Sequence, residues 1–563
     1  MMCGETNPLD GRQIVDWTPH NVRRTTLLTI ALLSAAMVAC PGCGGEPKLN
    51  STDSTAQRPA ATSQTARLNS RQDGDSSPQH SPQTELAETT GLPTYSLPAS
   101  SLPASEPSTP PDTAEVATES SDPDDQQPVG RQRTEDLFLP EGEQRRGPPQ
   151  PPPWRPPIED ERAKAAGIRR LDGKHIVVYT DLPAKAAVDE LPRAFDLAVP
   201  QWCRYFGVDV DSAKDWKVTG YVMDNRQRFR ATGLLPDDLP PFLHGFQRSF
   251  ELWVYEQPSD YYRRHLLLHE GVHAFMRWRL GGAGPPWYME GMAEFLGTHR
   301  WQGGKLQVGY VPRSREESDH WGRVRIIKDD VDESGPLNLA HVIQYGPQAH
   351  LQVEPYAWSW AACLFLDQHP TYQAAFRSTQ KRLQEGDRSF NRYFLKGIEK
   401  HAARLDAEWQ VFASEVEYGH DVARCAIEVV ESKPFSTKAS TRISAVRGWQ
   451  SAGLRLPPGR YSVRASGRFQ IADDGRPWMS EADGVTIRYY RGRPLGQLLA
   501  AVANLDEPAR TPTRLLTPVA IGGNGEIAVK TTGDLYLRIN DSPGELRDNK
   551  GEVTVTVDRA AAR

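Results

Sequence analysis

The sequence predicts a mixed α+β domain followed by a small all-β sandwich, both behind a long disordered N-terminal tether. Three observations support this fold class. Residues 41–167 are rich in Ser, Thr, Pro, Gln and Asp and show almost no apolar periodicity. Across residues 168–430, strand-like and helix-like apolar patterns alternate and then become mainly helical. Residues 434–560 hold short β-rich runs separated by Gly, Pro, Asp and Asn, which is typical of an antiparallel sandwich.

The composition narrows the function classes. At 563 residues, the chain is long enough for two or three domains. Its net charge of −6, without a sustained basic patch, argues against nucleic acid as a partner. Six cysteines are too few for a disulfide scaffold in a chain of this length. Whether Cys203, Cys363 and Cys425 pair is left open.

The N-terminus has the features of an export signal. Arg23 and Arg24 precede an uncharged, largely apolar stretch, residues 25–39, that is too short to span a bilayer as a mature helix. The stretch ends in Met-Val-Ala before Cys40, which resembles the lipobox of bacterial lipoproteins, where the cysteine becomes the lipidated first residue. The resemblance implies that residues 1–40 are a lipoprotein signal peptide and that a lipid on Cys40 anchors the protein to an extracytoplasmic membrane face, in the periplasm or at the cell surface. Ordinary signal cleavage beside an incidental cysteine is the alternative.

The polar segment at 41–167 is expected to be a spacer. It ends in a proline-rich run at 147–157. Such a segment cannot bury enough apolar surface to offset its ordering entropy, so we expect a disordered tether that is stiffened at its end.

The α+β domain is expected to begin with strands and to become helical. The expected elements are a strand at 174–179, a helix at 184–206 interrupted at Pro200, strands at 216–223 and 250–255, and later helices that include 357–366 and 390–413.

An H-E-x-x-H motif is formed by His269, Glu270 and His273. On a helix, residues four apart share one face, so both imidazoles can hold one metal ion. Glu270 would lie close enough to take a proton from water at the metal, and zinc lowers the pKa of such water to roughly 7. Apolar neighbours favour a helix, which the Gly-Gly pair at 281–282 would end. A helix that carries two core histidines is the structural alternative.

A second helical run, opened by two prolines, contains Glu290 and Glu294. Catalytic zinc takes three protein ligands and leaves one position for water, and Glu290, seventeen positions after His273, can complete the set. Glu294 could accept the other ring N–H of a ligating histidine. Apolar residues between the two glutamates favour a buried helix over an exposed acidic face. Gly291 would let the two helices approach closely beside the metal.

Residues 287–294 resemble the W-x-x-E-G-x-A-E element of gluzincin metallopeptidases, the thermolysin-like and aminopeptidase-like group. The resemblance is local, and it implies a zincin fold for the α+β domain. It also implies that Glu290 is the third zinc ligand and that Glu294 holds His269. The gap between His273 and Glu290 is a little shorter than in the best-known members, which keeps Glu294 as the alternative ligand.

Gluzincins also use a downstream Tyr or His as a donor to the oxyanion of the tetrahedral intermediate. His341, Tyr345, His350 and Tyr356 are the candidates in this chain. We prefer Tyr356 because it introduces a helical run; a packing role is the alternative.

Three further features near the motif remain open. The strand at 250–255 could pair with an extended substrate, as such strands do in this group, or be purely structural. His265 and His299 are expected to be structural or solvent-facing.

The turn at 540–549 is dense in oxygen-bearing side chains and lies between strand-like runs at 535–539 and 553–557. Calcium prefers six to eight oxygens from carboxylates, amides and backbone carbonyls, and this loop can supply several. Asn, Asp, Gly and Pro are also ordinary hairpin residues, so a plain turn is the alternative.

The order of residues in this turn, N-D-x-P-G-x-x-x-D-N-x-G, resembles the calcium loop of the galactose-binding LecA-type lectins. The resemblance implies side-chain ligands from Asp541, Asp548 and Asn549 and a backbone carbonyl ligand from Glu545. It also implies a lectin-like sandwich over 434–560, in which sugar hydroxyls coordinate the calcium directly. The sugar-contacting residues outside the loop do not align, so calcium without sugar stays open.

These features predict a lipid-anchored, extracytoplasmic zinc metallopeptidase with a peptide or protein substrate. Ca²⁺ and a carbohydrate are the ligands expected of the C-terminal domain if its loop is a calcium site. Two alternatives remain: a zinc amidase that acts on cell-wall material, and an inactive peptidase fold that serves as a surface carbohydrate-binding protein. The presence of candidates for all the zinc ligands and for the general base speaks against the second alternative.

Overall fold

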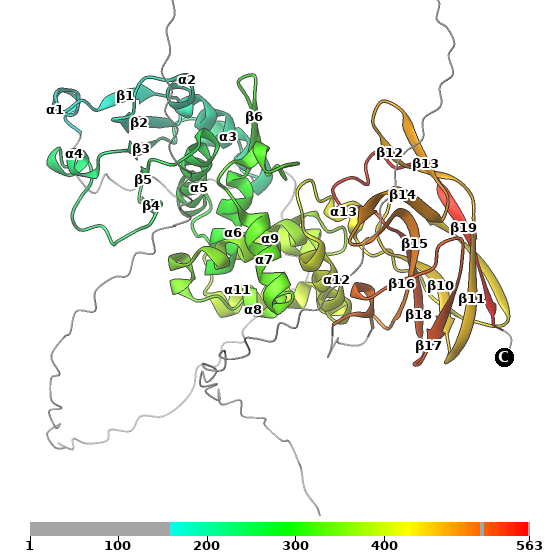
Figure 1. Ribbon diagram of the computed structural model, residues 1–563. Coiled ribbons are helices and arrows are strands. Elements are labelled where there is room, and N and C mark those ends of the chain that lie inside the picture. The colour runs from blue at the N-terminus through cyan, green and yellow to red at the C-terminus, as the bar shows by residue number, and fades with distance from the viewer. Residues whose placement is uncertain (1–157, 507–511, 561–563) are drawn as a thin grey trace, which may run out of the picture. The chain divides into compact units, whose positions relative to one another are not determined.

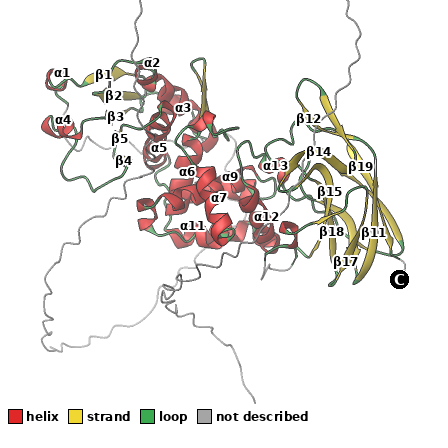
Figure 2. Ribbon diagram, in the orientation of Figure 1, coloured by secondary structure: helices red, strands yellow, loops and turns green. Residues whose placement is uncertain are grey.

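The computed structural model describes residues 158–506 and 512–560. The expected signal peptide at 1–40, with Cys40, and residues 41–157 of the expected tether lie outside these ranges. The first part of the described chain mixes strands and helices, the middle is helical, and the last part is built from strands (Figure 1; Figure 2). No helix in the described ranges has both the length and the apolarity needed to cross a bilayer.

The expected tether boundary is wrong at its C-terminal end, because residues before 168 are folded. Helix α1 (Asp160–Ala165) precedes the first strand, and Ala163 is buried. The side chain of Asp160 accepts a 2.6 Å hydrogen bond from the Tyr179 hydroxyl. Ala163 and Ile168 pack in one apolar cluster with Tyr179 and other residues of the first sheet, so this segment does bury apolar surface.

A five-stranded sheet, with strand order β1-β2-β3-β5-β4, forms the first layer. Its three central strands are parallel to one another, and the two edge strands pair antiparallel. One face packs in the main core with helices that include α3 (Leu191–Phe206) and α5 (Asp260–Arg279). The other face packs in the cluster that holds Ala163 of α1 and Phe229 of α4 (Arg226–Ala231). Burial on both faces explains why the central strands are almost continuously apolar in sequence. The bounds are β1 (Arg169–Asp172), β2 (Ile176–Thr180), β3 (Val218–Met223), β4 (Gly245–Arg248), β5 (Glu251–Tyr255) and α4 (Arg226–Ala231).

Helix α3 (Leu191–Phe206) follows the short helix α2 (Ala186–Asp189) and runs through Pro200, where the sequence predicted an interruption. A proline inside a helix costs about 3 kcal/mol. Here Phe195 and Trp202, on either side of Pro200, are fully buried, so packing of the whole helix outweighs this cost.

Helices α5 (Asp260–Arg279) and α6 (Pro286–Gly297) carry the candidate metal ligands. The Ser259 side chain caps α5 by accepting a hydrogen bond from the Tyr262 backbone N–H. Proline at the first position of α6 fits a helix start, because that N–H has no partner within the helix.

Gly291 does permit a close helix contact, but with a different helix from the one expected. A Cβ at residue 291 would clash with the Ser359 backbone and the Cys363 side chain, both on α9 (Val353–Gln368). Close packing of α6 on α9, rather than on α5, therefore requires glycine at this position.

The remaining helices enclose an aromatic-rich core. The predicted helix at 390–413 is divided: α11 ends at Gly397, Ile398 is buried, and α12 begins after a short 3-10 turn at 399–401. The bounds are α7 (Arg323–Ser334), α8 (Leu339–Val342), α10 (Gln373–Ser378), α11 (Asp387–Gly397), α12 (Ala402–Glu415) and α13 (Val422–Cys425), with a hairpin of β6 (His299–Gln302) and β7 (Lys305–Val308).

The C-terminal part is a β-sandwich region. One sheet has the order β14-β15-β18-β10-β8, with β16 beside β15, and the other has the order β17-β11-β19-β9. Inward-facing residues such as Val463, Leu535 and Val555 are buried in one shared cluster. The bounds are β8 (Lys433–Pro434), β9 (Lys438–Ser444), β10 (Gln450–Leu456), β11 (Gly459–Ser466), β12 (Phe469–Asp473), β13 (Pro477–Ser480), β14 (Asp483–Tyr490), β15 (Arg493–Ala503), β16 (Val519–Ala520), β17 (Asn524–Val529), β18 (Gly533–Ile539) and β19 (Glu552–Arg559).

Candidate metal centre

Three predicted ligands converge between α5 and α6. His269 Nε2 lies 3.0 Å from His273 Nε2, and each of these nitrogens lies 3.3 Å from Glu290 Oε2. The two histidines are one helical turn apart on α5, and Glu290 comes from the second turn of α6. All three residues are buried. The structure therefore brings these side chains to one point.

The spacing of these three atoms fits a zinc ion. Zinc binds histidine nitrogen and carboxylate oxygen at about 2.0–2.1 Å, so two tetrahedral ligands lie about 3.3 Å from each other. Burial by itself raises the pKa of Glu290, but the adjacent His273 and His269 outweigh it and hold that pKa well below its usual value. The group is thus an ionised carboxylate beside two imidazoles, which is a donor set that zinc accepts.

Glu294 is held behind His269 by several donors. Its Oε1 lies 3.3 Å from His269 Nδ1, on the side of the ring opposite to the three-ligand cluster. The Trp321 indole N–H donates to Oε2 at 3.1 Å. Arg323 at the start of α7 donates to both oxygens, at 2.9 and 3.0 Å. These contacts hold Glu294 against the Nδ1 side of the His269 ring, while Glu290 lies at the Nε2 atoms of both histidines.

His265 is also buried at this carboxylate, with Nε2 3.3 Å from Glu294 Oε2. His265, His269 and Glu294 form a second group with metal-compatible spacing. Because Arg323 already neutralises Glu294, we interpret this second group as hydrogen-bonded support for the first. His299 is buried as well, but its ring bonds the Gly297 carbonyl at 2.8 Å and lies outside the cleft lining.

Glu270 lies beside the ligands and is almost fully buried. Burial raises the pKa of its carboxyl to about 8, although the nearby His269 opposes the shift. A Cβ on Gly245 of strand β4 would clash with this carboxylate. Glycine at 245 therefore leaves the space in which the Glu270 carboxylate lies.

A cleft of about 410 Å³ opens next to the three ligands and Glu270. Its walls come from α5, α6, strand β4 with the loop before it, and the starts of α7 and α9. Two large apolar side chains on these walls are solvent-exposed, Leu243 at 59% and Val353 at 40%. The cleft is large enough for a few residues of a bound chain.

Among the candidate oxyanion donors, Tyr356 reaches the cleft. It lies in the first turn of α9, and its ring centroid is 5.8 Å from that of His269. Burial raises the pKa of its hydroxyl, so the group stays protonated at neutral pH. His341 and Tyr345 pack against each other outside the cleft lining. The side chain of His350 lies outside the described part of the structure.

The strand at 250–255 does not have the free edge that substrate pairing requires. Strand β5 is paired on both sides, with β3 and β4. The edge strand is β4, whose residues 245–247 line the cleft. The prediction missed β4 because its four residues carry little apolar alternation.

The sequence-based prediction missed several further residues at the site. Trp321 and Arg323 lie far from the motif along the chain, and only folding brings them to Glu294. Tyr262 and Arg277 line the cleft from the motif helix itself. Their spacing from His269 and His273 along α5 is the signal that could have identified them.

The predicted calcium loop places two of its predicted ligands side by side. Asp541 and Asn549 are buried together, with Asn549 Nδ2 2.7 Å from Asp541 Oδ2. Burial raises the pKa of Asp541 to about 7. The buried Oδ1 atoms of Asp548 and Asn549 accept no hydrogen bond from described residues. The Glu545 carboxylate pairs with Arg488 at 2.5 Å, which does not bear on the predicted role of its backbone carbonyl.

The same loop also contacts the segment between α12 and β8. The Ser542 hydroxyl and the Gly544 backbone N–H donate to the Glu417 carboxylate, and Arg547 pairs with Asp421 at 3.1 Å. Part of the loop is therefore already occupied by protein contacts.

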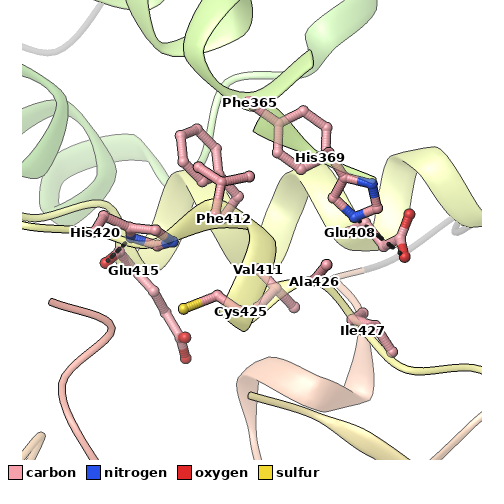
Figure 3. A pocket seen from close by; sticks show the side chains of 11 residues that line it. Phe365, His369, Glu408, Val411, Phe412, Glu415, His420, Cys425, Ala426 and Ile427 are labelled. Carbon is pink, nitrogen blue, oxygen red and sulfur yellow. Dashed lines mark hydrogen bonds and ion pairs between the residues drawn. The ribbon is translucent and has the colours of Figure 1, made fainter. Parts of the chain in front are cut away.

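A second cavity is far smaller, about 20 Å³, and holds at most one water molecule. Phe365, Phe412 and Val411 line it together with buried polar side chains (Figure 3). Figure 3 shows His369 beside Glu408, and His420 with Cys425 on the other side of the cavity. Cys203, Cys363 and Cys425 are all free thiols in the described structure.

Comparison with known proteins gives a weak structural similarity. No protein-family model matches the chain, and no curated protein matches it. Among solved structures, it is similar to one described as "EclA N-terminal domain; PllA-like lectin", at 20% sequence identity and a TM-score of 0.16. The match covers 22% of this chain and 95% of that chain.

Proposed function

We propose that the chain is a zinc-dependent peptidase of the gluzincin type. The observation that carries the proposal is the convergence of His269, His273 and Glu290 within 3.0–3.3 Å, beside the Glu270 carboxylate in an open cleft. A structural zinc site is usually closed by four protein ligands, whereas a catalytic site keeps one position open to a cleft. Zinc bound here would polarise the scissile carbonyl and lower the pKa of the attacking water.

Glu270 is the proposed general base and acid. It follows the ligand His269 directly, and its carboxylate faces the cleft through the space that Gly245 leaves. In this position it would accept a proton from the attacking water and deliver it to the leaving amine.

Tyr356 and strand β4 are the proposed substrate-facing groups. The Tyr356 hydroxyl would donate a hydrogen bond to the developing oxyanion. The edge of β4 that pairs with no other described strand would pair with an extended peptide by main-chain hydrogen bonds, which places a peptide bond beside Glu270. A substrate with an extended backbone, rather than a compact small molecule, suits this edge.

The test separates metal binding from catalysis. Wild-type protein should hold one zinc per chain, and Glu270→Gln should retain the zinc while it loses cleavage of a peptide mixture followed by mass spectrometry. His269→Ala should lose both. A zinc-loaded wild type that cleaves no peptide would reject the peptidase proposal and favour the amidase alternative, which cell-wall amides would then test.

The cellular location of the protein is a proposal that rests on the sequence of its N-terminus. We infer that a lipid on Cys40 anchors the chain outside the cytoplasm. Mass spectrometry of the mature N-terminal peptide should show a lipid-modified Cys40. An unmodified N-terminus at another residue would reject the anchor.

For the C-terminal sandwich we propose calcium binding by Asp541, Asp548 and Asn549, with the Glu545 carbonyl as a further ligand. The buried Oδ1 atoms of Asp548 and Asn549, which accept no hydrogen bond from described residues, support this. A carbohydrate bound through that calcium would have to approach on a side that Glu417 and Asp421 leave open. Glycan-array binding that a chelator abolishes would support the lectin function, and calcium binding without glycan binding would reject it.

A further inference from the structure

Arg277 stands on the ligand face of helix α5. Residues 269, 273 and 277 are spaced by one turn each, so their side chains project from the same side of the helix. Arg277 lines the cleft together with His269 and His273. It is solvent-exposed, whereas residues 262–276 of the same helix are buried. The guanidinium therefore lies at the open end of the row of metal ligands.

The other arginines of α5 have strong partners. Arg263 donates to Glu256 at 2.7 Å, Arg264 lies 3.2 Å from the His299 ring nitrogen, and Arg279 donates to the Ser212 carbonyl at 2.8 Å. The Arg277 guanidinium lies 3.9 Å from the Met289 sulfur and forms no ion pair with a carboxylate of the described residues, although its charge lowers the pKa of Glu270. A thioether is a weak acceptor, so most of the donors of Arg277 remain available.

The second arginine in the cleft lining, Arg323, does not have donors available for a ligand. Both oxygens of Glu294 engage it, and its side chain is 6% exposed. Within the described lining, Arg277 is thus the guanidinium that can meet a ligand. A guanidinium presents a planar fork of N–H donors that matches the two oxygens of a carboxylate.

From this geometry we propose that Arg277 determines specificity by binding a carboxylate of the substrate. This inference rests on the peptidase function proposed above. The carboxylate is either the C-terminal group of the substrate or the side chain of an Asp or Glu near the scissile bond. Both would place an anion one helical turn beyond His273, at the mouth of the cleft.

The experiment begins with a peptide that the zinc-loaded wild type cleaves, identified in a peptide mixture. That peptide is then made in three forms: unmodified, with an amidated C-terminus, and with each Asp or Glu replaced by Asn or Gln. KM and kcat are measured for wild type, Arg277→Gln and Arg277→Lys. Arg325→Gln is the matched control, because Arg325 is exposed on α7 and pairs only with Asp329 in the described structure. Binding of the uncleaved peptide is measured in the Glu270→Gln background by fluorescence anisotropy.

Arg277→Gln should raise KM and the Kd of the unmodified peptide by about ten- to hundredfold, the effect of losing a charged hydrogen-bonded pair. It should leave the zinc content unchanged, and its effect on KM should exceed its effect on kcat, because the Arg277 charge also lowers the pKa of Glu270. Arg277→Lys should restore part of the affinity, and Arg325→Gln should behave as wild type.

The peptide forms identify the source of the carboxylate. If it is the C-terminus, amidation weakens binding to wild type and adds nothing to Arg277→Gln. If the carboxylate belongs to an Asp or Glu side chain, the Asn or Gln form of the peptide binds wild type more weakly, and Arg277→Gln binds that form as it binds the unmodified peptide. Equal binding of all forms by wild type and Arg277→Gln would overturn the inference and leave the peptidase function standing. A zinc-loaded wild type that cleaves no peptide would overturn the proposed function, and the inference with it.

Discussion

Arg323 and Glu294 form a bidentate ion pair beneath the candidate metal centre, with N···O distances of 2.9 and 3.0 Å. The side chains are 6% and 1% exposed. The same carboxylate faces His269 Nδ1 at 3.3 Å. An arginine from α7 therefore supports one proposed zinc ligand on α5 through a glutamate on α6.

Replacing Arg323 by Met should impair both folding and metal binding. Glu294 would remain buried without its charge partner, which costs about 3–5 kcal/mol of unfolding free energy. Loss of the support behind a ligating histidine typically lowers metal affinity by about 10–100-fold. Urea denaturation and competition with a zinc chelator measure the two effects.

The double variant Arg323→Met with Glu294→Leu is the control for this prediction. It should recover much of the stability, because no unpaired charge stays buried, while the zinc affinity stays low. Wild-type zinc affinity in Arg323→Met would contradict the support that we assign to Glu294.

Gly245→Ala should lower peptide cleavage without loss of zinc. The added Cβ would clash with the Glu270 carboxylate and displace it. Displacement of a catalytic group by about 1 Å can reduce the rate by about 100-fold. Measurement of kcat, together with zinc content and circular dichroism, checks this. Unchanged kcat would show that the position of Glu270 does not depend on Gly245.

Gly291→Ala should destabilise the fold, because the new methyl group would meet the Ser359 backbone, which cannot move as a side chain can. Overpacking of this kind costs about 1–3 kcal/mol. Gly346→Ala is the matched control, since a Cβ there meets nothing within 4 Å. Equal unfolding midpoints for the two variants would argue against the close contact between α6 and α9.

His420 should make stability fall on acidification. Burial lowers the pKa of its imidazole to about 4, whereas the unfolded chain has a pKa near 6.5. Above pH 6.5 the ring is neutral in both states, so it has no effect. As the pH falls from 6.5 to 4, the unfolded state binds a proton that the folded state excludes, and stability is lost. At pH 5 the loss is about 2 kcal/mol by linkage.

The variant His420→Phe isolates this contribution. Phe keeps the contact with the Phe412 ring and cannot titrate. Urea denaturation at pH 7 and pH 5 should show a smaller decrease for the variant than for wild type. An equal decrease would mean that His420 is accessible to protons in the folded state.

The sequence predicted features that depend on local pattern. The H-E-x-x-H spacing was enough to place His269 and His273 on one helix face, and the short β-rich runs indicated the C-terminal sandwich. The sequence-based prediction failed where a contact between residues far apart in the chain determines the local structure. Pro200 stays inside a helix because the residues on both sides are buried, and α1 folds because Ala163 reaches the first sheet.

The site shows the same division. Glu290 and Glu294 were found because they lie one turn apart on a recognisable helix. The prediction missed Arg323, Trp321 and the edge strand β4. Their roles arise only when α7 and the first sheet pack against α5 and α6. The partner of Gly291 was misassigned to α5 for the same reason, since the sequence does not show that α9 covers α6.

The zinc-edge X-ray absorption spectrum of the purified chain tests the central claim most directly. It should show one zinc per chain with nitrogen and oxygen ligands at about 2.0–2.1 Å and the scattering pattern of two imidazoles, reduced to one imidazole in His273→Ala. A metal-free protein, a sulfur-ligated zinc, or a spectrum that neither His273→Ala nor Glu290→Ala alters would contradict it.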